Sequence, residues 1–219
     1  MEIKKIVLLL FPFIINKFDF QSNERESFFE TGKVKKKILE KKGFIQLNDE
    51  EIMKLINVDC SQEVKEIIHH YPNSKLLLAN YPNNGEQFDS LNSELAKEGK
   101  KISNIILLNI SSYELILEIK KEYLICPLCE KIYKQEEIIK EGKVFCPQDN
   151  EYYFSLEDIK KFSDYIIEYH LKNTELIIKK FLTENKGSVS SIIHLDINKK
   201  EEIFNGEIQR NLLKAIERL

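Results

Sequence analysis

The stretch Asn104–Ile110 has the sequence NIILLNI, in which apolar residues follow one another with asparagine at only two places. Three further apolar runs of similar length are Ile6–Phe11, Lys75–Ala79 and Ser191–Leu195. Each run is continuous rather than alternating, which is typical of strands in a parallel sheet that is covered on both faces. We therefore expect these four runs to form the buried parallel sheet of the protein.

Segments with the periodicity of amphipathic helices lie between the predicted strands. They are Glu24–Lys42, Asp49–Asp59, Ser61–Tyr71, Glu86–Lys100, Ser112–Lys121, about Leu156 to Asn185, and Lys200–Leu219. Strands that alternate with helices along the chain predict an α/β fold. A chain of 219 residues is long enough for one such domain with an inserted subdomain.

The segment 122–155 interrupts this alternation. It contains turn residues, short β-like pieces at 131–133 and 143–145, and three of the four cysteines of the chain. We expect a small β insertion here, between the helix that follows one strand and the long helix that precedes the next.

The cysteines of the insertion have the spacing of a zinc site. The sequence is CPLC at Cys126–Cys129, then sixteen residues, then CPQD at Cys146–Asp149. Two residues between ligands place both side chains toward one metal ion, and zinc accepts thiolate and carboxylate ligands in a tetrahedron. The predicted ligands are therefore Cys126, Cys129, Cys146 and Asp149. A full set of four protein ligands favours a structural zinc, which would hold together an insertion too small to have a core of its own.

These two knuckles, inserted in an α/β chain of this length, resemble the lid of zinc-containing bacterial-type adenylate kinases. Other segments are similar to that family in the same order along the chain. They are residues 42–52, residues 76–83 with Gln87, residues 114–126, residues 129–133 and residues 202–208.

The resemblance implies a P-loop-kinase-like parallel sheet flanked by helices, with a small zinc-stabilised lid. It assigns residues 1–121 and 156–219 to the α/β core, with a helical region resembling the monophosphate-binding part at about 22–72. Residues 122–155 would then be the lid.

The phosphate-binding loop that the resemblance implies is absent from the sequence. After the first strand the chain reads Pro12-Phe13-Ile14-Ile15-Asn16, and the first glycine is Gly32. A loop that wraps phosphates with backbone N–H groups needs glycine, because side chains block the approach. Phenylalanine and isoleucine would fill this place with hydrocarbon.

The arginines of the family are missing as well. The positions that match its strand-end acid and arginine are Ala79 and Asn83, and those that match the two arginines before the lid are Ile119 and Tyr123. Of 33 basic residues only Arg25, Arg210 and Arg218 are arginine. Phosphoryl transfer depends on charged groups that position and stabilise the transferring phosphate. We therefore expect no catalysis.

Four hypotheses about function remain. The first is a pseudoenzyme that acts as a zinc-stabilised scaffold for a macromolecular partner. The second is a non-catalytic nucleotide binder that holds AMP through Gln87, which resembles the family's reader of the adenine edge; the competing interpretation of Gln87 is a solvated polar residue at a helix start. The third is a zinc-ribbon module docking on RNA or a ribonucleoprotein such as the ribosome. The fourth is an active nucleoside monophosphate kinase.

Composition limits the classes of partner and compartment. The formal net charge is −3, which gives no broad basic field for nucleic acid. Three clustered cysteines and the separate Cys60 fit a cytoplasmic or other reducing compartment better than a disulfide framework. No segment reaches the roughly 18 consecutive apolar residues of a membrane-spanning helix, so no membrane is expected.

Overall fold

The computed structural model of the protein describes most of the chain after residue 60 and selected residues before it. The described residues are 5–10, 39, 43–46, 55, 61–71, 74–79, 81–110, 112–128, 132–140, 143–146, 152–186, 191–199, 202 and 207–219.

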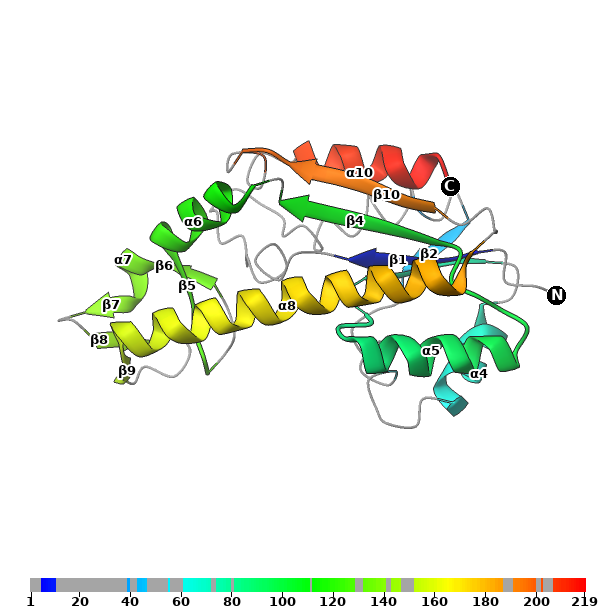
Figure 1. Ribbon diagram of the computed structural model, residues 1–219, viewed down its shortest axis with the longest axis horizontal. Coiled ribbons are helices and arrows are strands. Elements are labelled where there is room, and N and C mark those ends of the chain that lie inside the picture. The colour runs from blue at the N-terminus through cyan, green and yellow to red at the C-terminus, as the bar shows by residue number, and fades with distance from the viewer. Residues whose placement is uncertain are drawn as a thin grey trace.

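A five-stranded parallel sheet forms the centre of the protein (Figure 1). Its strands, in spatial order, are β10 (Ser191–Ile197), β4 (Asn104–Ile110), β1 (Lys5–Leu10), β3 (Lys75–Ala79) and β2 (Phe44–Gln46). All four pairings are parallel. The structure thus confirms the predicted α/β class with a central parallel sheet, an architecture consistent with a P-loop-like fold.

The central strand β1 shows why the apolar runs are continuous. Its side chains alternate between two apolar clusters, with Val7 and Leu9 in one and Ile6, Leu8 and Leu10 in the other. A strand with a hydrophobic layer on each face has no solvent-exposed side, and both sets of side chains must be apolar.

Helices supply the layers on the two faces. The described helices of this part are α4 (Ser61–His70), α5 (Gly85–Lys97), α6 (Tyr113–Glu122), α8 (Leu156–Glu184) and α10 (Glu207–Glu217). Side chains of α4, α5 and the second half of α8 belong to the cluster around Leu8. Side chains of α6 and α10, with Ile167 of α8, belong to the cluster around Leu9.

The observed elements match the predicted ones with shifts of a few residues at their ends. Within the predicted helix Lys200–Leu219, α10 spans Glu207–Glu217 and Glu202 is helical as well, whereas residues 200, 201 and 203–206 lie outside the described residues. The fifth strand, β2, was not predicted. It has only three residues and lies at the edge of the sheet, so it leaves no long apolar run, although Phe44 is fully buried. The predicted helices Glu24–Lys42 and Asp49–Asp59 lie outside the described residues except for Leu39 and Leu55, which are both helical.

The predicted β insertion lies between α6 and α8, as expected. It contains β5 (Tyr123–Ile125) paired with β6 (Ile132–Lys134), and a three-stranded antiparallel sheet of β7 (Ile139–Lys140), β8 (Lys143–Phe145) and β9 (Tyr152–Ser155). The short helix α7 (Gln135–Ile138) joins the two sheets. Figure 1 shows the insertion at one end of the molecule, where α8 begins.

The insertion has a hydrophobic core that it shares with α8. Leu124, Tyr133, Ile138 and Val144 form a buried cluster with Cys126, Cys146 and Ile159. Ile159 comes from the first turns of α8, so the long helix completes a core that the insertion could not build from its own strands.

Candidate functional site

The sheet has a topological switch point between β1 and β4. The chain leaves β1 toward the β2 edge of the sheet and leaves β4 toward the β10 edge. In open α/β sheets, ligands bind outside the carboxyl ends of the strands at such a point. The carboxyl edge of β1 and its neighbours is therefore the place in this fold where a nucleotide site would be built.

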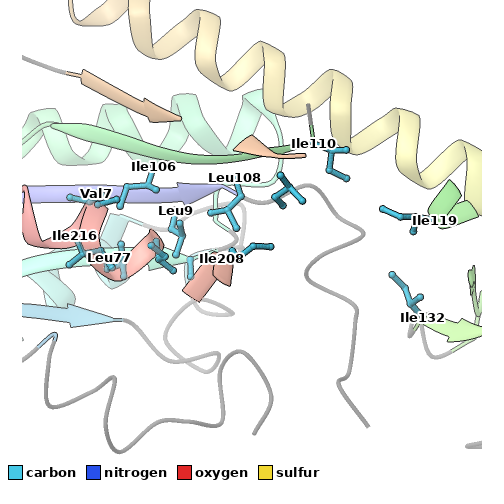
Figure 2. Close-up of a cluster of buried hydrophobic side chains, with 14 of the residues drawn as sticks. Val7, Leu9, Leu77, Ile106, Leu108, Ile110, Ile119, Ile132, Ile208 and Ile216 are labelled. Atoms are coloured by element: carbon cyan, nitrogen blue, oxygen red, sulfur yellow. The ribbon is translucent and has the colours of Figure 1, made fainter. Parts of the chain in front are cut away.

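The strands end at this edge in buried apolar residues. Leu10 ends β1, Ala79 ends β3, Ile110 ends β4 and Ile197 ends β10, and each is less than 9% exposed. Ala79, Ile110 and Ile197 belong to the same cluster as Val7 and Leu9 (Figure 2). The last residues of these strands thus contribute hydrocarbon, whereas one position earlier the exposed Asp196 of β10 accepts a hydrogen bond of 3.2 Å from Asn109 Nδ2 of β4. The residues after Leu10, including Phe11–Ile15 and Asn16, lie outside the described residues, as does Asn80.

Gln87 lies in the first turn of α5 and takes part in the helix cap. The side-chain oxygen of Asn84 accepts a hydrogen bond of 2.9 Å from the Gln87 backbone N–H. The side-chain oxygen of Gln87 in turn accepts a hydrogen bond of 2.7 Å from the Asn83 backbone N–H. This reciprocal pattern is that of a capping box, displaced by one residue. Gln87 therefore has a structural task at the position that resembles the adenine reader.

The two positions that match lid arginines lie in the apolar cluster. Ile119 of α6 is 2% exposed and is a member of the cluster that contains the strand ends. Tyr123, which begins β5, is partly buried and packs against the same cluster. Figure 2 shows the labelled members extending from Val7 and Leu9 in β1 to Ile119 and Ile132 beyond the end of the sheet.

Ser163 is a buried polar residue at the base of the insertion, and the sequence reasoning did not identify it. It is 4% exposed, and its Oγ accepts a hydrogen bond of 3.0 Å from the backbone N–H of Ile125. Ile159, Ser163 and Ile167 are spaced by four residues, so they share one face of α8. In the sequence, Ser163 is a polar residue between Ile159 and Ile167 on one apolar face of the predicted helix, and this pattern could have identified it.

Cys126 and Cys146 occupy the core of the insertion. Cys126 follows β5 and Cys146 follows β8, and both are 2% exposed and members of the same buried cluster. The structure thus brings together one cysteine from each predicted knuckle. Cys129 and Asp149, the other two predicted ligands, and the separate Cys60 lie outside the described residues.

The chemistry of this pair fits a thiolate metal site. Two cysteines in one small cluster, each three residues before a further predicted ligand, offer the sulfur donors that zinc prefers. Within the described ranges, no three His, Cys, Asp or Glu residues gather closely enough to hold a metal ion. Zinc binding therefore remains a prediction that depends on all four residues.

Among the helices of the described segments, none is both long enough and apolar enough to cross a membrane.

Comparison with known proteins leaves the chain without an assigned family. No protein-family model matches it, and no curated protein matches its sequence. The functional conclusion must therefore be drawn from the chain's own residues.

Proposed function

We propose that this chain is a catalytically inactive protein of adenylate-kinase-like architecture, which acts as a zinc-stabilised scaffold or binding protein within a larger assembly. The partner is a macromolecule, protein or ribonucleoprotein. The sequence resemblance supports the proposed architecture. The environment of Ala79, Ile119 and Tyr123 supports the absence of catalysis.

The observation that carries the proposal is the burial of positions where the resemblance requires charge. Ala79 replaces the strand-end acid and Ile119 replaces an arginine, and both lie inside one apolar cluster. Tyr123, at the second arginine position, packs against it. Phosphoryl transfer consists largely of positioning and charge stabilisation, so a site lined with hydrocarbon at these positions lacks the groups that perform it.

The order of elements supports the architectural half of the proposal. The resemblance implies a parallel sheet with a lid inserted before its last strand. The described sheet is parallel, and the β insertion lies between β4 and β10, the last two core strands along the chain.

Zinc would be held by Cys126, Cys129, Cys146 and Asp149. When bound, it would supply a structural cross-link between the two knuckles. The residues of the chain would provide the rest of the stability, since Cys126 and Cys146 already belong to a packed cluster with Leu124 and Val144.

Calorimetric titration of the purified chain with Mg-ATP, ADP and AMP tests the proposal, with the zinc content measured on the same sample. We expect no binding of any nucleotide at millimolar concentration and one zinc per chain. Binding of Mg-ATP together with phosphoryl transfer to AMP would overturn the proposal. Binding of AMP alone would favour the nucleotide-binding hypothesis and make Gln87 the residue to examine.

A further inference from the structure

We propose that the β insertion is locked to the sheet domain and forms a rigid arm, with α8 as its spine, rather than a lid that opens and closes. The inference goes beyond the proposed function, because it concerns motion and does not depend on zinc or on catalysis. It rests on three sets of contacts at the junction between α6, the insertion and α8.

The first contact is the buried hydrogen bond from Ile125 N–H to Ser163 Oγ, 3.0 Å long. It joins β5, the first strand of the insertion, to the third turn of α8. Moving β5 away from α8 would leave a buried N–H without a partner, and proteins rarely tolerate such a group. The bond therefore opposes rotation of the insertion about this junction.

The second set of contacts surrounds the last turn of α6. Lys120 Nζ lies 2.5 Å from Asp164 Oδ1, so an ion pair bridges α6 and α8 beside Ser163. The backbone carbonyl of Lys120 accepts a hydrogen bond of 3.2 Å from Gln135 Nε2 in α7. Lys120 of α6 thus contacts both α8 and α7, the short helix that follows the first hairpin of the insertion.

The third set is apolar and continuous with the core of the sheet. Ile125 of β5 and Ile132 of β6 belong to the same buried cluster as Leu9 and Leu108 of the central strands. A hinged lid needs a junction with few buried apolar contacts, since each opening would expose them to water. Here the first hairpin of the insertion is part of the main hydrophobic core.

The helix α8 connects the three hydrophobic clusters that the described residues form. Ile159 packs in the core of the insertion, Ile167 in the cluster that joins the insertion to the sheet, and Phe181 in the cluster on the other face. The helix is uninterrupted over 29 residues, and Figure 1 shows it running from the insertion to beneath the sheet. An unbroken helix anchored at three places holds the two ends of the molecule at a constant distance.

The distance between the arm and the sheet domain tests the inference in the full-length chain. A keto amino acid at Glu136 in α7 and at Ala96 in α5, both exposed, can carry nitroxide labels without using the native cysteines. We expect electron–electron double resonance to give one narrow distance distribution that Mg-ATP and AMP leave unchanged. Two populations, or a shift of several ångströms on adding nucleotide, would overturn the inference.

Removing the polar contacts at the junction should increase the motion of the arm. In the doubly labelled chain, Ser163→Ala combined with Lys120→Ala is expected to broaden the distance distribution while far-UV circular dichroism stays unchanged. The matched control is Lys161→Ala, which removes the exposed ion pair between Lys161 and Glu157 within α8 and should leave the distribution narrow. A narrow distribution in the double variant would show that these contacts do not hold the arm.

Hydrogen exchange in the unmodified chain tests the inference independently, because it needs no substitution that could unfold the protein. The amide of Ile125 should exchange as slowly as the amides of β4, because both require opening of the same core. If the Ile125 amide exchanged nearly as fast as an amide in an unfolded chain, the inference would be overturned. If the arm moves and no nucleotide binds, only the inference of a rigid arm is refuted. If a nucleotide binds and the arm does not move, only the proposed function is refuted.

Discussion

Gly85 of α5 lies directly against Leu176 of α8, so that a Cβ at position 85 would be 2.7 Å from Cδ2 of Leu176. It would also lie 3.0 Å from Cε of Lys180, whose Nζ pairs with Asp89 of α5. The two helices therefore approach closely where α5 begins, and a side chain at position 85 would have to displace the side chains of Leu176 and Lys180.

Gly85→Ala should destabilise the protein by about 1 kcal/mol, the low end of the usual cost of overpacking, because the side chains of Leu176 and Lys180 can shift. The measurement is urea unfolding followed by circular dichroism. Leu176 is 41% exposed, so Leu176→Ala alone should cost little. In the Leu176→Ala background, Gly85→Ala should become close to neutral, giving a coupling energy above about 0.5 kcal/mol. Additive effects would refute the proposed clash.

Ile119→Arg should damage the fold rather than restore a catalytic site. A guanidinium forced into the apolar cluster around Ile119 has no partner there, and we expect a loss of at least about 3 kcal/mol or failure to fold. Thermal unfolding and a nucleotide titration measure the outcome. Leu117→Arg is the matched control, because Leu117 is on the same helix and 37% exposed; it should change stability by less than about 0.5 kcal/mol. A stable Ile119→Arg chain that binds ATP would contradict both the packing and the proposed function.

Ser163→Ala should cost about 1–3 kcal/mol, because the buried N–H of Ile125 would lose its acceptor. Urea unfolding of the whole chain is the measurement. Ser93→Ala, at an exposed position of α5, serves as the control and should stay within about 0.5 kcal/mol of the parent. Equal stabilities for the two variants would mean that the Ile125 amide finds another acceptor.

Two substitutions at Gln87 separate its structural task from nucleotide recognition. Gln87→Ala removes the acceptor for the Asn83 N–H and should cost about 1 kcal/mol, as other lost helix caps do. Gln87→Glu keeps an acceptor, and its charge is favourable near the start of α5, so the stability should be retained. Because a carboxylate lacks the amide donor, AMP binding that survives in the Glu variant would exclude Gln87 as the reader of the adenine edge. AMP binding that is lost in both variants would instead favour the nucleotide-binding hypothesis.

Removing zinc should destabilise the insertion first. At free zinc a thousandfold above the dissociation constant, binding contributes about 4 kcal/mol to the folded state, so a strong chelator should lower the unfolding temperature clearly. Cys146→Ser should abolish the stoichiometric zinc, whereas Cys60→Ser should retain it. Amide signals from residues 132–146 should shift on chelation, while those of β1 and β3 change little. A chain that contains no zinc when purified from zinc-supplemented cells would refute the predicted metal site.

The strands of the sheet could be predicted because a strand that is buried on both faces needs a continuous run of apolar residues. Asn104–Ile110 and Lys75–Ala79 are continuous apolar runs, and both became strands within those bounds. Phe44–Gln46 has no such run, since three residues at an edge are too few to form a pattern. Its inclusion in the sheet depends on pairing with β3, a contact between segments about thirty residues apart.

The candidate site shows the same division. The spacing of CPLC and CPQD was enough to predict metal ligands, because ligands with two residues between them can face the same ion whatever surrounds them. That Cys126 and Cys146 share a packed core could not be predicted, because Ile159 of α8 completes that core from outside the insertion. Ser163 likewise looked like an ordinary helical serine until its hydrogen bond to Ile125 gave it a role.

The sequence by itself determined the α/β class, the place of the insertion and the absence of glycine and arginine at the positions where the resemblance implies them. These follow from local periodicity and from residue type, which are properties of neighbouring positions. Only the tertiary structure decided that Ala79 and Ile119 lie in one buried cluster, and that α8 joins the insertion to both faces of the sheet. Burial and coupling depend on contacts between segments distant in the chain, and no local pattern specifies which apolar faces will meet.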